Sequence, residues 1–321
     1  QLQVVISMGE YFDHAFFGIA QTTEMLSRGS PFLRKSPAQY LSFENKEVPV
    51  FVIGNGPSLD SSIEAIEEWR DKAIIISCGT ALSALHKYNI TPDFHAEIEQ
   101  NRATYDWCCR VNDFEYLKQI SLISVNGIHP DTCHLFKDVY IAFKDGESST
   151  VSALEVLGRK NYEELQFAFP TVSNLAINLI SKLGMQQVYL FGVDLGFYNK
   201  EKHHSQNSSY YLNGKEVYDY EATNNTSLVV RGNFRKTVFT KYEFKLSKTI
   251  IEQSLASNKL SCFNCSDGAK IVGTSPLSPE MVLIPSSSEH RDEALQAIRE
   301  QAFYVSDKQK NYREVFEQRF C

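Results

Sequence analysis

Short apolar runs alternate with amphipathic stretches through the central part of the chain. The runs have the length and β-branched composition of buried strands, and they lie at 49–53, 73–77, 94–98, 120–125, 139–143 and 188–191. Stretches with helical spacing lie between several of them, at 63–69, 81–88, 105–117 and 174–183. Strand, helix and strand in repetition predict an α/β fold: a Rossmann-like, mainly parallel sheet with flanking helices.

The rest of the chain has a different pattern. Residues 1–47 are expected to form a mostly helical N-terminal cap, and residues 276–321 a C-terminal helical region. Within the Rossmann-like domain at 48–275, the segment 196–236 is rich in Asn, Ser, Tyr, Lys and His. Long polar insertions in compact domains are usually functional or disordered, so this segment is interpreted as a lid over a site or as a hairpin insertion.

A glycine-rich turn follows the first strand of the alternating part. Gly54 and Gly56 allow a sharp turn and close approach of another group, and Asn55 and Ser58 add polar side chains. A helix begins directly afterwards, and free N–H groups at a helix start bind anions, most often phosphate. The alternative is a plain strand-to-helix turn. Leu59 replaces the third glycine of the dinucleotide fingerprint, and no Gly-Lys-Ser/Thr is present, which excludes an ordinary NAD site and a P-loop.

Polar turns follow other predicted strands as well. In parallel sheets, ligands bind beyond the carboxyl ends of the strands, near the point where the strand order reverses. The turns expected at this edge lie at 54–58, 78–80, 97–101, 126–129 and 192–195.

Three carboxylates stand at these strand ends. Glu97 and Glu99 share one face of a strand, and two such carboxylates can hold Mg²⁺ or Mn²⁺ against phosphates. The alternative is a pair of solvated charges where the strand leaves the sheet. Asp194 follows an apolar strand, where a lone carboxylate is costly unless it is paired. It contacts a ligand, or it accepts backbone N–H bonds in the turn.

Two adjacent histidines, His203 and His204, lie just after Asp194. Imidazole can take a proton from a hydroxyl group near neutral pH, so one of them is a candidate general base. The alternative is a pair of exposed loop residues. The hydrolase motif Gly-x-Ser-x-Gly is not present in the sequence.

Composition narrows the function classes. The net charge of −7 over 321 residues disfavours general binding to nucleic acid. No apolar run approaches the roughly 20 residues of a membrane helix. Seven cysteines show no disulfide rhythm, and the single Cys-x-x-Cys at 262–265 lacks the second pair of a zinc site. We therefore expect core or surface thiols and a cytoplasmic protein.

The motifs together resemble the bacterial Maf (motility-associated factor) family. They are Ile-Gly-Asn-Gly-Pro-Ser-Leu-Asp at 53–60, Ile-Ser-Cys-Gly-Thr-Ala-Leu at 76–82, Ile-Thr-Pro-Asp-Phe at 90–94, Phe-Gly-Val-Asp-Leu at 191–195 with the histidines at 203–204, and the segment at 264–274. The resemblance covers roughly residues 48–275. The glycine turn is also similar to that of bacterial CMP-sialic acid sialyltransferases.

This resemblance implies a glycosyltransferase of the sialyltransferase type. Its donor is a CMP-activated nonulosonic acid, its acceptor is Ser/Thr of flagellin, and its base is His204 or His203, with Asp194 as a third catalytic residue. CMP is expected to contact Gly54, Asn55, Gly56 and Ser58, and the polar strand ends extend the predicted nucleotide-binding set to Pro57, Gly79, Thr80, Glu97 and Asn126. A CMP leaving group carries its own phosphate charge, so a metal is less necessary than for a diphosphate, and Mg²⁺ stays an open cofactor.

Two other functions stay open. A related branch of the superfamily contains 6-hydroxymethyl-7,8-dihydropterin pyrophosphokinases, which implies ATP and Mg²⁺ with Asp194, Glu97 and Glu99 on the metal side. The third interpretation is a non-catalytic module that binds flagellin.

Overall fold

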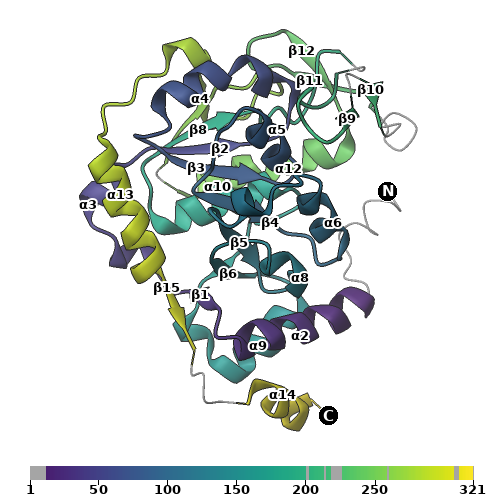
Figure 1. Ribbon diagram of the computed structural model, residues 1–321, viewed down its shortest axis with the longest axis vertical. Coiled ribbons are helices and arrows are strands. Elements are labelled where there is room, and N and C mark those ends of the chain that lie inside the picture. The colour runs from purple at the N-terminus through teal and green to yellow at the C-terminus, as the bar shows by residue number, and fades with distance from the viewer. Residues whose placement is uncertain are drawn as a thin grey trace.

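A computed structural model describes residues 12–199, 202–212, 215–217, 226–258, 260–306 and 311–320. One large sheet runs through the molecule in the order β14-β13-β8-β2-β3-β4-β5-β6-β1-β15, with β7 beside β6 (Figure 1). Its strands are β1 (Pro31–Leu33), β2 (Val50–Ile53), β3 (Ile74–Cys78), β4 (Phe94–Glu97), β5 (Ser121–Val125), β6 (Val139–Lys144), β7 (Glu164–Leu165), β8 (Gln187–Phe191), β13 (Ser261–Asn264), β14 (Thr274–Pro276) and β15 (Phe303–Val305). All pairings are parallel except β1 with β15, which confirms the Rossmann-like α/β fold.

Helices cover both faces of the sheet. They are α2 (Phe12–Ser27), α3 (Phe43–Glu47), α4 (Ile63–Trp69), α5 (Ala81–Lys87), α6 (Ala103–Cys109), α7 (Phe114–Leu117), α8 (Pro130–Cys133), α9 (Ser148–Leu157), α10 (Val172–Leu183), α12 (Tyr242–Ala256), α13 (Ser288–Ala297) and α14 (Tyr312–Phe320). Strand side chains alternate between the faces: Val50 and Val52 join the core with α10 and α12, whereas Phe51 and Ile53 join the core with α4 and α5. No helix of the described residues is long and apolar enough to span a membrane.

The strand order reverses between β2 and β8. From β2 the chain proceeds through β3, β4, β5 and β6 on one side, and β8 returns on the other side, parallel to β2 with Val50 beside Val188. The carboxyl ends of both strands therefore meet at one edge. This geometry places the turns after β2 and β8 against each other.

The ends of the chain contribute strands that the sequence pattern did not predict. Residues 1–47 were expected to be mostly helical, but β1 pairs with β6 through Phe32 and Ile141 and with β15 from the C-terminal region. The predicted helix at 105–117 is two helices, because Asn112 has a φ of 54° and Asp113 caps a new helix. The domain boundaries at 47 and 275 stay predictions, although the sheet takes strands from both sides of each.

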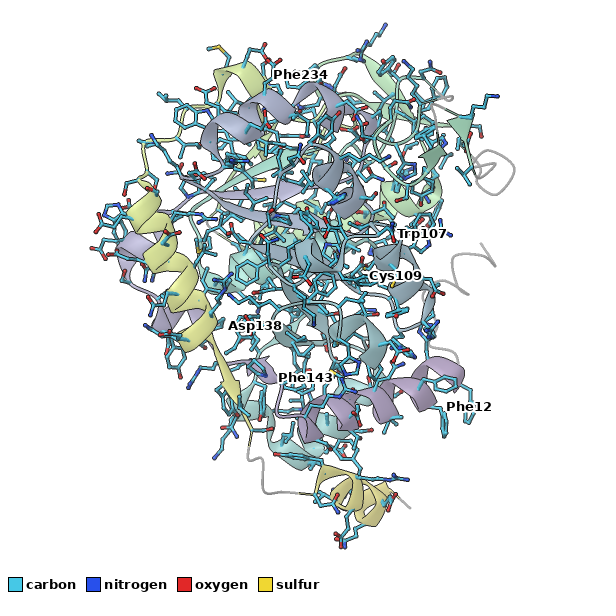
Figure 2. All side chains as sticks on the ribbon, in the orientation of Figure 1. Phe12, Trp107, Cys109, Asp138, Phe143 and Phe234 are labelled. Atoms are coloured by element: carbon cyan, nitrogen blue, oxygen red, sulfur yellow. The ribbon has the colours of Figure 1, made fainter. Side chains whose placement is uncertain are left out.

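Two hairpins occupy the polar segment after β8. β9 (Tyr211–Leu212) pairs with β10 (Lys215–Glu216), and β11 (Leu228–Arg231) pairs with β12 (Thr237–Thr240), both antiparallel. Figure 1 places them together, beyond α5 and α6. This part of the segment has the form of a hairpin insertion; residues 200–201, 213–214 and 218–225 lie outside the described residues. Figure 2 shows Phe12 at the outer end of α2, where it is exposed, and Trp107 near the hairpins.

Candidate active site

A cavity of about 310 Å³ lies at the edge where β2 and β8 end. It collects most of the predicted site residues: Gly54, Asn55, Gly56, Gly79, Thr80, Glu97, Glu99, Asp194, His203 and His204. These residues come from the ends of β2, β3, β4 and β8 and from the polar segment after β8. Pro57, Ser58 and Asn126 do not line it.

The glycines after β2 serve the close approach of two turns. The Gly54 amide donates to the Phe191 carbonyl at 2.8 Å, and the Gly56 amide donates to the Gly192 carbonyl at 2.7 Å. A Cβ on Gly54 would lie 2.5 Å from the Gly192 carbonyl oxygen. The backbone amides expected to seat a phosphate are therefore already bonded within the protein.

Asp194 takes the place that the sequence analysis assigned to a phosphate. Its Oδ2 accepts the Ser58 amide at 2.8 Å, and its Oδ1 accepts the Ser58 hydroxyl. The segment that begins there is a 3₁₀ helix, Pro57–Ser61, and an anion at such a start satisfies free N–H groups. Asp194 thus accepts a backbone N–H, as one of its two interpretations expected, although the donor is in the turn after β2. Asp194 also lines the cavity, so its ligand contact stays a prediction, as do the nucleotide contacts of Pro57 and Ser58.

Burial sets the ionisation of Asp194, whose exposed fraction is 2 %. Desolvation raises the pKa of this carboxyl from 3.8 to about 7, against the two Ser58 hydrogen bonds, which lower it. The nearby charges of Asp267 and Asp60 raise the pKa further. The carboxyl group holds the two turns together through Ser58, and its predicted catalytic role stays a prediction.

Asn55 is the polar side chain best placed to meet a ligand. Its Nδ2 donates to Thr80 Oγ1 at 2.8 Å, while its buried Oδ1 has no hydrogen-bond partner among the residues that the structure describes. A buried acceptor without a partner costs about 1–3 kcal/mol. Because Asn55 lines the cavity, a ligand N–H or O–H group would satisfy that oxygen.

The adjacent histidines form a chain of ring nitrogens that ends on a carboxylate. His203 Nε2 contacts Glu216 Oε1 at 2.9 Å, and His203 Nδ1 contacts His204 Nδ1. His204 stacks on Tyr210 with ring centroids 3.9 Å apart. Burial, then the neighbouring charges of His203 and Lys241, hold the pKa of His204 well below its usual value. His204 is therefore neutral near pH 7, the form that accepts a proton.

Asp60 fixes the segment that carries these histidines. Its two carboxylate oxygens accept the Ser205 hydroxyl and the Gln206 amide, the latter at 2.9 Å. The Ser205 amide also donates to the Asn55 carbonyl at 3.0 Å. The sequence analysis gave Asp60 no role, because Ser205 and Gln206 lie more than 140 positions away.

Aromatic side chains form another part of the cavity lining that the sequence did not reveal. Trp107 of α6 and Tyr210 lie with ring centroids 5.3 Å apart, and Phe244 of α12 lines the same cavity. Aromatic faces bind flat rings such as nucleobases and the apolar faces of sugars.

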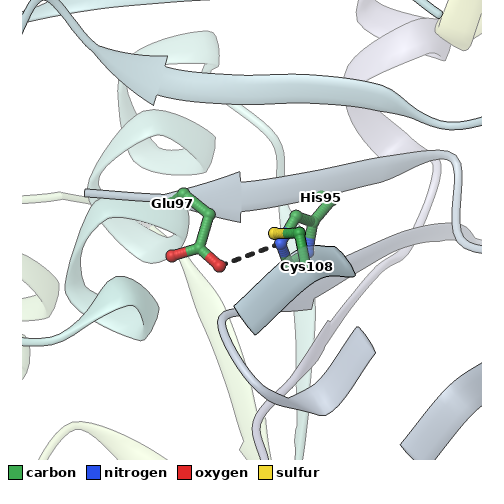
Figure 3. Close-up of side chains that lie close together, drawn as sticks. All are labelled: His95, Glu97 and Cys108. Atoms are coloured by element: carbon green, nitrogen blue, oxygen red, sulfur yellow. Dashed lines mark hydrogen bonds and ion pairs between the residues drawn. The ribbon is translucent and has the colours of Figure 1, made fainter. Parts of the chain in front are cut away.

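Glu97 and Glu99 both line the cavity, as the metal prediction requires. Burial raises the pKa of Glu99, and the charge of Glu97 raises it further. Glu97 Oε1 also lies within hydrogen-bond distance of His95 Nε2, at 3.0 Å (Figure 3). Their role as metal ligands stays a prediction.

Asn126 joins three elements through its side chain and does not line the cavity. Its Nδ2 donates to Thr22 Oγ1 at 2.9 Å and to Ser149 Oγ at 3.1 Å. Its Oδ1 accepts the Thr150 hydroxyl at 3.1 Å and the Lys144 amide at 3.3 Å. These partners belong to α2, β6 and α9, and the nucleotide contact of Asn126 stays a prediction.

Comparison with known protein families agrees with this architecture. The profile of the family described as 6-hydroxymethylpterin diphosphokinase MptE-like matches residues 25–200, more than half of the chain. The chain belongs to this MptE-like family. The matched region runs from α2 to the end of β8 and includes the turns that line the cavity.

A solved structure extends the comparison to the whole MptE-like chain. The Maf glycosyltransferase from Magnetospirillum magneticum AMB-1 superposes with a TM-score of 0.78 and 26% sequence identity, over 98% of this chain and 46% of that protein. The chain thus spans a little under half the length of that protein. The resemblance to the Maf family is confirmed. No curated protein matches the chain.

Proposed function

We propose that this MptE-like chain is a glycosyltransferase that uses a nucleotide-activated sugar. The observation that carries the proposal is the cavity at the switch point, which is lined by both Asn55, whose Oδ1 has no partner among the described residues, and the neutral His204. The 98% coverage of this chain by the Maf glycosyltransferase structure supports the same class of reaction.

We propose a CMP-activated nonulosonic acid as the donor, as the Maf resemblance implies. Asn55 Oδ1 would accept an N–H or O–H of the nucleoside, and Trp107 and Tyr210 offer aromatic faces. We propose Ser/Thr of flagellin as the acceptor, as the Maf resemblance implies. A cytoplasmic location belongs to the same proposal.

The histidine chain supplies the proton transfer. His204 takes the proton of the acceptor hydroxyl, whose oxygen attacks the anomeric carbon of the sugar. The bond from that carbon to the phosphate oxygen breaks, and CMP leaves with the electron pair. Glu216 and His203 hold the His204 ring in position for this step through their chain of contacts.

The shift of Tm on adding a nucleotide tests whether the protein binds CMP or CTP. CMP or CTP at about one hundred times Kd is expected to stabilise the folded protein by about 2.7 kcal/mol, which raises Tm by a few degrees. Asn55→Ala is expected to lose this shift because it removes the unpartnered acceptor, whereas the exposed Asn161→Ala retains it.

Transfer of sugar to purified flagellin, measured as an increase in flagellin mass, is expected to fail in His204→Gln.

The family description favours one second candidate, a Mg²⁺-dependent pterin diphosphokinase. Glu97 and Glu99 on the cavity wall are its supporting observation, because carboxylate oxygens are Mg²⁺ ligands. A melting shift with ATP and Mg²⁺ and none with CMP or CTP would replace the transferase proposal by this one. Flagellin binding that is unchanged in Asn55→Ala and His204→Gln, with no product from the wild type, would instead indicate a non-catalytic binding module.

A further inference from the structure

Three side chains of different chemistry meet beneath the wall of the main cavity. His95 and Glu97 project from the same face of β4, and Cys108 reaches them from α6 (Figure 3). Their exposed fractions are 0 %, 6 % and 4 %. One imidazole nitrogen, one carboxylate oxygen and the thiol sulfur all lie within 4.8 Å of one another.

This donor set suits a zinc-type ion and does not suit Mg²⁺. Imidazole, thiolate and carboxylate are the ligands of Zn²⁺, which binds nitrogen at about 2.0–2.1 Å and sulfur at about 2.3 Å. Ligand atoms around such an ion lie roughly 3.5 Å apart, so the three side chains need to approach one another by no more than roughly an ångström. The contact between His95 Nε2 and Glu97 Oε1 is already 3.0 Å.

The imidazole ring is held in the orientation that a ligand needs. Ser77 Oγ of β3 lies 2.8 Å from His95 Nδ1, and the Phe136 ring stacks on the imidazole with centroids 5.3 Å apart. Nε2 therefore faces Glu97 and Cys108. A partner on the second ring nitrogen is typical of metal-binding histidines, because it sets the tautomer and the ring orientation.

There is space for one ion beside two of these ligands. A second cavity of about 20 Å³ is lined by Glu97 and Cys108, and this volume accommodates one water-sized particle. Glu97, Trp107, Gly79 and Thr80 line both this cavity and the main one. A fourth coordination position would therefore face the main cavity, which is the arrangement of zinc sites with three protein ligands and one exchangeable ligand.

We propose that His95, Glu97 and Cys108 bind a single zinc-type transition-metal ion whose open position faces the main cavity. Binding converts the Cys108 thiol to a thiolate and releases its proton to solvent. The proposal does not depend on which nucleotide the main cavity takes. The alternative is a hydrogen-bonded chain from Ser77 through His95 to Glu97, with Cys108 as an apolar packing residue.

Cobalt titration of the full, chelator-treated chain distinguishes the two. Co²⁺ is expected to bind with one ion per chain and to give the thiolate-to-cobalt charge-transfer absorption that a sulfur ligand produces. Zn²⁺ is expected to abolish that absorption by displacement, and Mg²⁺ to leave it unchanged. A titration of the wild-type protein with no thiolate band overturns the proposal.

Substitutions at Cys108 and Ser77 test whether the proposed side chains bind the ion. Cys108→Ser is expected to lose the thiolate-to-cobalt band. The half-buried neighbour Cys109 provides the matched control, and Cys109→Ser is expected to retain the band. Ser77→Ala keeps the three ligands but releases the ring, and is expected to weaken Co²⁺ binding roughly 10–100-fold. A band that persists in Cys108→Ser, arising for example from Cys262 and Cys265, overturns the proposal. If Cys108→Ser does not fold, an unchanged Co²⁺ affinity in Ser77→Ala has the same consequence.

Discussion

Asp194 and Ser58 lie 136 positions apart in the chain, yet their contact holds the two turns of the switch point together. The Asp194 carboxyl group at the start of the 3₁₀ helix accepts the Ser58 N–H, a group that could otherwise bind a phosphate. Gly54, Asn55 and Gly56 still line the cavity, so nucleotide binding at this turn stays a prediction.

The stability of the protein is expected to depend on pH through Asp194. Because burial raises its pKa from 3.8 to about 7, the folded state keeps a proton that the unfolded state loses between these values. The contribution of this group to the free energy of unfolding is complete below about pH 4 and is lost as the pH rises through about 7. Asp194→Asn, which mimics the protonated group, is expected to flatten this dependence in urea titrations at several pH values. The exposed Asp71→Asn should leave it unchanged, and a flat wild-type profile would contradict the assignment.

Gly54, directly after β2, is expected not to tolerate a side chain. Gly54→Ala places a Cβ against the Gly192 carbonyl, which cannot move without separating β2 from β8, so we expect a loss of about 3 kcal/mol in the free energy of unfolding. Gly146→Ala meets no atom within 4 Å and tests only the cost of a φ of +83°, about 1 kcal/mol. Equal losses in the two variants, measured by urea unfolding, would show that backbone conformation alone explains the effect.

At the scale of elements, the segment from His203 to Tyr211 depends on contacts outside itself. Asp60, from the 3₁₀ helix after β2, binds the segment through Ser205 and Gln206. The position of the histidines is thus set by the same turn that lines the cavity. A change at Asp60 should move the histidines without touching a ligand.

Asp60→Ala is expected to loosen this segment. The Gln206 amide loses its acceptor, so its hydrogen exchange should accelerate roughly tenfold, and glycosyl transfer should fall through kcat. Hydrogen exchange followed by mass spectrometry measures the first effect. Glu67→Ala, on the exposed face of α4, serves as the control, and unchanged exchange at Gln206 in Asp60→Ala would show that other contacts fix the segment.

At the scale of the whole molecule, the two ends of the chain complete the central sheet. β1 and β15 extend it at one edge, α13 contacts α3, and Leu295 and Phe303 belong to the same apolar core as α10 (Figure 1). A buried ion pair between Asp93 and Arg291 ties α13 to the start of β4. The C-terminal elements are therefore expected to unfold together with the sheet.

Removal of this ion pair tests that coupling. Arg291→Ala leaves the largely buried Asp93 carboxylate without its cation, and we expect the free energy of unfolding of the whole protein to fall by about 3 kcal/mol. Arg313→Ala breaks an exposed pair on α14 and should cost well under 1 kcal/mol. A separate early transition in Arg291→Ala, seen by two spectroscopic probes, would show instead that α13 unfolds independently.

The sequence alone determined the central α/β alternation and the edge of the sheet at which the cavity lies. Buried parallel strands require continuous apolar runs, and such runs marked β2, β3, β4, β5, β6 and β8 to within a residue or two. Because carboxyl ends of parallel strands share one edge, the residues Asn55, Glu97 and His204 were predicted to lie together, and the cavity contains all three.

Only the tertiary structure decided the roles of single residues. Asp194 bonds Ser58, 136 positions away, and Asp60 bonds Ser205, 145 positions away, and no local pattern encodes such contacts. β1 was missed because a three-residue strand carries too little periodicity to separate from a loop. His95, Glu97 and Cys108 form a cluster for the same physical reason: strand alternation aligns the first two, but only the packing of α6 brings the thiol to them.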